Sequence, residues 1–199
     1  MATVQDSLVI ANPLPSGDGY TWTLASRLGE IISDIEAQFG KRDRSWTILG
    51  IEFCDSGPKT WFPGDCGHIV IQLGSSAKED PVQALFQLAH ESVHLLDPVV
   101  SSFGTVLEEG LATYFSLQYI EQFHSNYTTS DMNYATAARL TAHLLDINPM
   151  AIKELRSRGI KIAQITASQL LAVCPKLPKS IALALVTPFH DWIESTIIS

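Results

Sequence analysis

The segment at positions 90–94, with the pattern His-Glu-Ser-Val-His, has the clearest chemical potential in the chain. On an α-helix, residues four apart lie on one face, so the imidazoles of His90 and His94 can share one zinc ion. Glu91 lies one step around the helix from His90. Its carboxylate can take a proton from a water molecule beside the metal without being a ligand itself. The spacing therefore predicts a zinc site with Glu91 as general base.

The residues around this motif favour a buried helix. Asp80 and Pro81 supply an N-cap and a proline at the first helical position, and Gln83 falls at the third position of a capping box. Residues 84–86, 88–89 and 95–96 are apolar. A buried His-Glu-His group without a partner is costly in free energy, so a metal site is favoured over a chance match of the pattern.

A catalytic zinc site usually has three protein ligands and one open position, so a third ligand is needed. Two adjacent glutamates, Glu108 and Glu109, are the candidates. Thr105 suits an N-cap, which puts Glu108 at the third helical position, where it completes a capping box. Glu109 points about 100° away and is predicted to be the ligand. The alternative is that both acids only favour a helix N-terminus through its dipole. Gly110 and Ala112 are expected to let the two helices approach closely.

The motif at 90–94 followed by Glu-Gly-Leu-Ala at 109–112 resembles the gluzincins, the thermolysin-like and aminopeptidase-like zinc metallopeptidases. The resemblance covers residues 80–115 and extends to no other part of the chain. It implies a zincin-like α+β fold and one Zn²⁺ per chain. By this resemblance His90, His94 and Glu109 are the ligands and Glu91 is the base.

Two features depart from that family pattern. His94 and Glu109 are separated by 14 residues, fewer than in the aminopeptidases that the motif resembles. Many members also have an aspartate four residues after the ligand glutamate, where it orients a zinc histidine. Thr113 stands there in this chain, and a hydroxyl orients a histidine less strongly than a carboxylate does. Asp97 is an alternative orienter, although a helix end before Pro98 is the favoured interpretation of that residue.

The resemblance also implies a tyrosine or histidine from the C-terminal part that donates a hydrogen bond to the oxyanion. Tyr134 and His143 are the candidate catalytic residues for this role. Tyr114, Tyr127 and His124 are alternatives, and spacing singles out none of the five. Ordinary packing is the competing interpretation for Tyr134, and a core or boundary position is that for His143.

Related peptidases bind substrate as an additional strand on the sheet edge that precedes the zinc helix. The strand predicted at 68–73 occupies that place here, and a peptide added to it would direct alternate side chains into pockets. Trp61 and Phe62 are candidates for lining such a cleft, with packing as the default interpretation. A strand buried between two others would exclude this mode of docking.

Periodicity and turn residues divide a single domain, residues 1–199, into a sheet-containing part at about 1–79 and a helical part at about 80–199. No linker separates the two parts. The predicted elements are strands at 7–11, 46–53 and 68–73, a loop at 55–63, and helices at 24–39, 80–96, 106–123, 131–147, 149–158, 166–173 and 179–196.

Composition restricts the class of protein. With 46% hydrophobic and 17% charged residues, the 199-residue chain has material for a core. The net charge of −8 gives no basic footprint for nucleic acid. No apolar run approaches the roughly 18–20 residues that span a membrane, and the N-terminus lacks a secretory pattern. The odd number of cysteines adds to a prediction of a cytoplasmic protein, with pairing of Cys54 and Cys66 left open.

These observations predict a zinc-dependent metallopeptidase, in particular a metalloendopeptidase or metallopeptidase of gluzincin type, acting on a peptide or protein substrate. A regulatory protein partner is left open. The alternative is a non-proteolytic zincin-like binding or scaffold domain that retains or lacks the metal.

Overall fold

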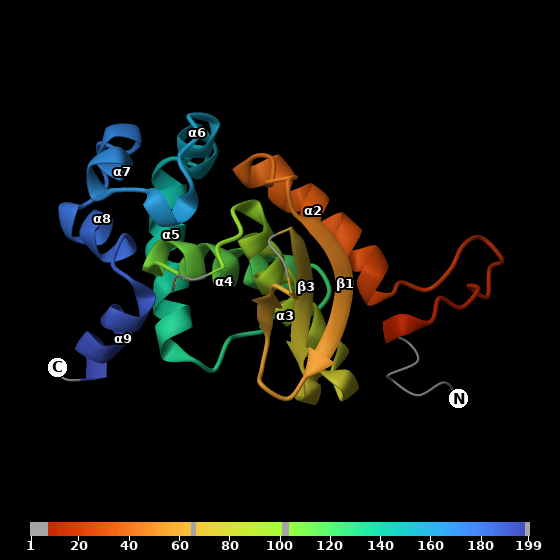
Figure 1. Ribbon diagram of the computed structural model, residues 1–199. Coiled ribbons are helices and arrows are strands. Elements are labelled where there is room, and N and C mark those ends of the chain that lie inside the picture. The colour runs from red at the N-terminus through yellow and green to blue at the C-terminus, as the bar shows by residue number, and fades with distance from the viewer. Residues whose placement is uncertain (1–7, 65–66, 101–103, 198–199) are drawn as a thin grey trace.

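A three-stranded sheet lies beside a larger set of helices in the computed structural model of the protein, which describes residues 8–64, 67–100 and 104–197, with side chains as far as 193 (Figure 1). The strand order is β1 (Thr47–Cys54), β3 (His68–Gly74), β2 (Lys59–Trp61). β1 is parallel and β2 antiparallel to β3. The expected α+β class, with a small sheet and mostly helical content, is confirmed.

The central position of β3 corrects one prediction. Its residues Ile69, Val70, Ile71 and Leu73 are buried, as expected for a strand with a partner on both sides. The predicted addition of a peptide to 68–73 is therefore wrong, because both edges of this strand are paired. Within the described sheet, β2 and β1 are the edges.

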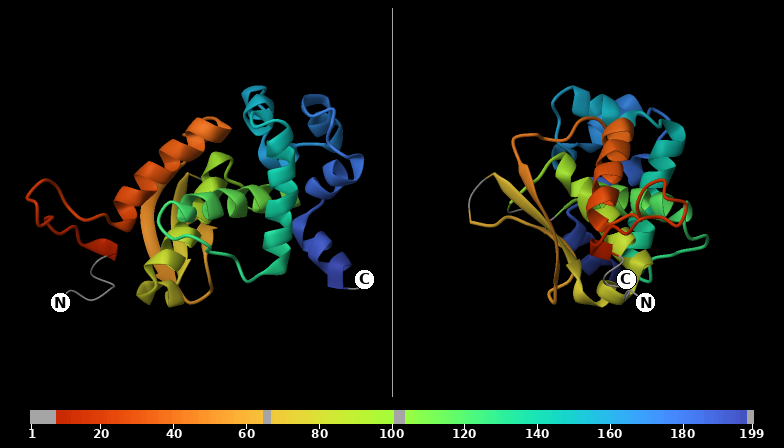
Figure 2. Two further views of the ribbon diagram at one scale, coloured as in Figure 1. Left: turned by 180° about the vertical axis from the view of Figure 1, so that it is seen from behind. Right: turned by 90° about the vertical axis from the view of Figure 1, so that its right-hand side faces the viewer.

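Helices α2 (Leu24–Phe39) and α3 (Pro81–Val93) lie on one face of the sheet (Figure 2). Thr23 starts α2 with a capping box, and Gly40 ends it at a φ of 94°, a conformation that glycine adopts without strain. The 3-10 helix η1 (Ser75–Glu79) joins β3 to α3. On the other face of the sheet Leu49 is 56% exposed, so the core lies between the sheet and the helices.

Helix α4 (Val106–Glu121) packs closely against α5 (Met132–Ile147), and the absence of a side chain at Gly110 makes this close contact possible. A Cβ at Gly110 would lie 2.5 Å from the carbonyl oxygen of Ala137 and would also collide with Thr141 Oγ1. The expected close approach at Gly110 is thus real, but its partner is α5 and not the helix that carries the His-Glu-Ser-Val-His motif.

The C-terminal part consists of short helices that stack beside α5 (Figure 1). The predicted helix at 179–196 is in fact two, because Pro188 cannot continue a helical hydrogen-bond pattern. The segment at Pro188 instead pairs with Thr105 as a β-bridge, and Phe189 donates its N–H to the carbonyl of Gly104 at 2.8 Å. The helical elements of this part are α6 (Ala151–Ser157), η3 (Ile162–Gln164), α7 (Ala167–Val173), α8 (Lys179–Leu185) and α9 (Phe189–Ile197). One further short 3-10 helix, η2 (His94–Leu96), directly follows α3.

Several local predictions change. Leu8 and Val9 are helical, so the strand predicted at 7–11 is wrong where the structure describes it, and the loop predicted at 55–63 contains β2. Asp80 caps α3 as predicted, but Gln83 contacts Ser76 and no capping box is formed. Cys66, and with it the question of a Cys54 pair, lies outside the described residues. None of the described helices combines the length and apolarity needed to cross a membrane.

Candidate metal centre

Three helical elements bring the predicted metal ligands together. His90 lies in the last turn of α3, His94 begins η2 directly after it, and Glu109 lies in the first turn of α4. Asp80 fixes the start of α3 by accepting hydrogen bonds from the backbone N–H groups of Val82 and Gln83. The caps at Asp80 and Thr105 therefore fix where each helix begins.

The three side chains converge on a small volume. Glu109 Oε2 lies 3.2 Å from His90 Nε2 and 3.8 Å from His94 Nε2. One ligand atom from each of His90, His94 and Glu109 lies within 4.8 Å of the others. The three side chains are 13–15% exposed, so a ligand can still reach them. Two imidazoles and one carboxylate are the donor set of many catalytic zinc sites, and the residues present fit a zinc ion.

Glu108 has a position that the sequence did not reveal. Its N–H donates to Thr105 Oγ1 at 3.2 Å, as the predicted N-cap requires. Its carboxylate, however, does not complete a capping box: Oε1 lies 3.3 Å from His94 Nδ1. A carboxylate on the second ring nitrogen fixes the tautomer and orientation of a metal-binding histidine. Glu108 is therefore placed to direct His94 Nε2 toward Glu109.

Gly104 makes room for both glutamates. A Cβ at this position would lie 2.7 Å from Glu109 Oε1 and 3.3 Å from Glu108 Oε2. The carbonyl of Gly104 accepts the hydrogen bond from Phe189 that ties the start of α9 to this turn. The missing side chain thus lets two carboxylates face the histidines from one helix start.

Glu91 is 5% exposed and lies beside His90 and His94 without belonging to the ligand group. Burial raises the pKa of its carboxyl group, an effect that the adjacent His94 and His90 oppose. A carboxyl group with a raised pKa can both accept and return a proton near neutral pH. Its surroundings therefore suit the predicted role of general base.

His94 and Glu109 each stabilise the charged form of the other. Burial alone would lower the pKa of His94, but Glu109, Glu108 and Glu91 outweigh it and raise this pKa to about 10. Burial alone would raise the pKa of Glu109, but the neighbouring His94 and His90 outweigh this effect and hold the pKa below its ordinary value. Without a metal, a proton on His94 compensates the carboxylates, and a metal cation would have to displace it.

Of the two candidate oxyanion donors, Tyr134 and His143, the structure brings Tyr134 to this cluster. It lies in the first turn of α5, and its ring centroid is 5.7 Å from that of His90. Burial, followed by the carboxylates of Glu109 and Glu91, raises the pKa of its hydroxyl. The phenol therefore stays protonated at neutral pH and can donate a hydrogen bond.

The other candidates lie elsewhere. His143 is exposed and lines neither of the cavities beside the cluster, and Tyr114 accepts a hydrogen bond from Gln118 at 2.7 Å. His124 is exposed, with its ring 6.4 Å from that of Tyr127. Tyr127 faces a cavity next to the cluster but packs on Phe86.

Neither Asp97 nor Thr113 orients a histidine. Asp97 accepts hydrogen bonds from Arg156 Nε at 3.0 Å and from the N–H of Ile162 at 3.1 Å. Thr113 is completely buried, and its Oγ1 has no hydrogen-bond partner. Among the described residues, the carboxylate of Glu108 is the one that contacts Nδ1 of His94.

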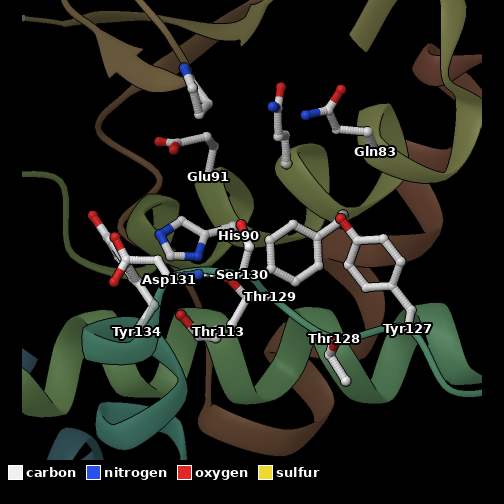
Figure 3. A pocket seen from close by; sticks show the side chains of 13 residues that line it. Gln83, His90, Glu91, Thr113, Tyr127, Thr128, Thr129, Ser130, Asp131 and Tyr134 are labelled. Carbon is white, nitrogen blue, oxygen red and sulfur yellow. Dashed lines mark hydrogen bonds between the residues drawn. The ribbon is translucent and has the colours of Figure 1, made fainter. Parts of the chain in front are cut away.

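Two adjoining cavities open onto the cluster, and both include His90, Glu91, Tyr134 and Pro58 in their walls. The first, the Phe86 cavity, has a volume of about 320 Å³ and lies between α3 and the segment 127–134 (Figure 3). It is lined by Pro58, Gln83, Phe86, Gln87, His90, Glu91, Thr113, Tyr127, Thr128, Thr129, Ser130, Asp131 and Tyr134.

The second, the Lys59 cavity, has a volume of about 220 Å³ and extends past His94 and Glu109 to β2. Lys59 and Thr60 of β2 line it, whereas the predicted cleft residues Trp61 and Phe62 line neither cavity. Phe62 packs edge-on against Trp46 at 5.2 Å, and Trp61 is 42% exposed. From the loop predicted at 55–63, the residues that line the cavities are therefore Pro58, Lys59 and Thr60.

Comparison with known proteins gives no match to a family model, to a curated protein or to a solved structure.

Proposed function

We propose that this protein is a zinc-dependent metallopeptidase with a zincin-like active site of gluzincin type. The observation that supports this most directly is the convergence of His90, His94 and Glu109 within 4.8 Å, with the buried Glu91 beside them and an open cavity on each side. A cation-binding group, an adjacent base and access for a substrate are the parts that metal-assisted hydrolysis requires.

When bound, zinc would polarise the scissile carbonyl group and lower the pKa of water toward 7. Glu91 takes a proton from the attacking water and later delivers it to the leaving amine, a transfer for which its raised pKa is suited. The hydroxyl of Tyr134 donates a hydrogen bond to the oxygen that gains negative charge.

Substrate binding is proposed at β2. This strand is an edge of the described sheet, and Lys59 and Thr60 border the Lys59 cavity next to the ligands. An extended peptide beside β2 would form backbone hydrogen bonds, with alternate side chains directed toward the cavities. The edge proposed for docking is thus the short antiparallel strand and not β3.

The test is a digest of a broad peptide library by the wild type and by Glu91→Gln, together with elemental analysis of both proteins. We expect about one zinc per chain in both, and a cleavage rate about 10²–10⁴-fold lower in the variant. Glu79→Gln, an exposed glutamate on η1 outside both cavities, is the matched control and should cleave like the wild type.

The rival interpretations give different results. Full zinc content without cleavage by either protein would favour a zincin-like binding or scaffold domain. Absence of zinc after gentle purification, with no effect of chelators on stability, would favour a metal-free structural role for His90 and His94.

A further inference from the structure

The Phe86 cavity has a chemical character of its own. Its volume of about 320 Å³ is enough for one large side chain, and it adjoins His90 and Glu91 directly. A group bound there would therefore belong to the residue next to the bond that is cleaved. Which side chain fits is decided by the charges, the aromatic surfaces and the unpaired polar atoms of the walls.

Charge is the first of these. The lining residues include the carboxylates of Glu91 and Asp131 and no lysine or arginine. Asp131 is exposed at the entrance, where one oxygen caps α5 by accepting the N–H of Asn133 at 2.8 Å. Asp80 lies near enough to the hydroxyl of Tyr127 to raise its pKa further, after the effect of burial. The cavity is thus attractive to a cation and unfavourable for an anion.

Aromatic surface is the second. The rings of Phe86 and Tyr127 both line the cavity and form one wall, with centroids 5.1 Å apart. Figure 3 shows the ring of Tyr127 on this side of the cavity. Such faces pack against the alkyl part of a long side chain and attract an ammonium or guanidinium group. Neither ring has a cationic partner among the described residues, whereas Arg27 lies over the rings of Trp22 and Phe123 elsewhere in the molecule.

The third is a buried hydroxyl without a partner. Thr113 is 0% exposed, its Oγ1 makes no hydrogen bond, and it belongs to the wall of this cavity. An unsatisfied buried hydroxyl is unfavourable in the free protein, so it indicates a ligand group that completes it. The free lone pairs of this oxygen suit an N–H donor.

We propose that the Phe86 cavity binds the lysine or arginine side chain of a peptide substrate, at the residue adjoining the scissile bond. The alkyl stem packs along the wall formed by Phe86 and Tyr127, the cationic end is attracted by Asp131, and an N–H group donates to Thr113 Oγ1. This inference rests on the proposed peptidase function and adds the substrate class.

The test uses one fluorogenic peptide in which the residues on either side of the cleaved bond are varied among arginine, lysine, norleucine, glutamine and glutamate. We expect kcat/KM to be at least about tenfold higher for arginine or lysine than for norleucine, the uncharged residue of similar length, on one side of the bond. The glutamate peptide should be the poorest substrate. A preference for norleucine or glutamate would overturn the inference while leaving the peptidase function intact.

Two substitutions connect this preference to the cavity. Asp131→Asn removes the charge but keeps a residue that caps helices well, and Thr113→Val removes the hydroxyl at nearly the same shape. Each should reduce the arginine-to-norleucine ratio of kcat/KM several-fold, and together about tenfold. Asp146→Asn, an exposed aspartate on the same helix as Tyr134 but outside the cavity, is the control and should keep the wild-type ratio.

Binding separates this inference from the proposed catalysis. The anisotropy of the same labelled peptides with zinc-loaded Glu91→Gln gives the ratio of Kd values without cleavage. Tighter binding of the arginine peptide, weakened by Asp131→Asn or Thr113→Val, would support the cavity even if the wild type cleaved nothing. Equal Kd values for the arginine and norleucine peptides would refute it, and melting curves of each variant verify that the fold is retained.

Discussion

His94 and Asp97 are three positions apart in the chain, yet they belong to two buried charged groups with opposite properties. In the metal group, the carboxylates of Glu91, Glu108 and Glu109 lie beside the imidazoles of His90 and His94. In the Arg156 group, defined by Asp97 and Arg156, a permanent cation is already in place. One group has an excess of negative charge, and the other is neutral.

The Arg156 group is fully hydrogen-bonded. The guanidinium donates to both oxygens of Asp97, and also to the backbone carbonyls of Phe39, Gly40, Lys41 and Leu96 at 2.7–3.1 Å. It thereby ties α6 to the end of α2 and to the segment after η2. The N–H groups of the guanidinium are already engaged within the protein, so we assign this group to stability. The metal group, which has an excess of negative charge, is assigned to function.

The largest expected effect lies in the Arg156 group. Arg156→Met removes the cation and leaves Asp97 buried without compensation, which should lower the free energy of unfolding by about 3–5 kcal/mol. Urea unfolding of the metal-free proteins measures this. Zinc affinity should remain that of the wild type where the variant is folded. A variant as stable as the wild type would break the comparison between the two groups.

In the metal group, Tyr134→Phe should lower the activity and leave the stability unchanged, whereas Arg156→Met should lower the stability. Removing an oxyanion donor should lower kcat by about 10²–10³-fold, because the hydrogen bond forms only as charge develops on the substrate. The hydroxyl is not a predicted ligand, so zinc content and the melting temperature should change little. Single-turnover cleavage is the measurement, with Tyr114→Phe as the control because Tyr114 lies outside both cavities. Unchanged kcat would exclude Tyr134 from the reaction.

Glu108→Ala separates orientation from ligation. Loss of the carboxylate on His94 Nδ1 should weaken zinc binding by about 10–100-fold without changing the one-to-one stoichiometry. Glu109→Ala, which removes a ligand, should weaken it more. Competition with a chromogenic chelator measures both Kd values. If Glu108→Ala were the weaker binder of the two, the assignment of ligand and orienter would have to be exchanged.

The smallest effect is expected at Glu36, whose cationic partners are exposed. A hydrogen bond from Lys41 at 2.8 Å, opposed by burial and aided by Arg42 and Arg44, lowers the pKa of Glu36 from 4.5 to about 2. Lys41 and Arg44 are 76% and 68% exposed, so solvent screens these pairs. Glu36→Gln should therefore cost only about 1–2 kcal/mol of stability at pH 7.

The sign of the pH dependence follows from the lowered pKa. The stabilisation by Glu36 is complete above pH 4.5, and it is lost as the pH falls toward 2, because the folded state then takes up its proton. The stability difference between the wild type and Glu36→Gln should shrink over that range. A difference that grew on acidification would contradict the assigned interactions.

Local chemistry in the sequence determined much of what the structure contains. The caps at Thr23, Asp80, Thr105 and Thr166 start helices where the sequence predicts them, because a capping side chain bonds to backbone groups only two or three residues away. Helical periodicity likewise gave the face that His90 and His94 share. Glu109 was preferred to Glu108 as the third ligand because Glu108 was expected to complete a capping box, which the structure does not form.

Tertiary structure decided the features that depend on segments far apart in the chain. Strand order made β3 central and β2 an edge, and no local pattern encodes which strands become neighbours. The role of Glu108 depends on the distance between α3 and α4, and Tyr134 rather than His143 reaches the cluster because α5 presents its first turn there. The close packing of α4 on α5 at Gly110 and the unpaired hydroxyl of Thr113 also emerge only once the helices are assembled. Local hydrogen bonds fix where elements begin, whereas burial of apolar surface over the whole chain fixes which of their side chains meet.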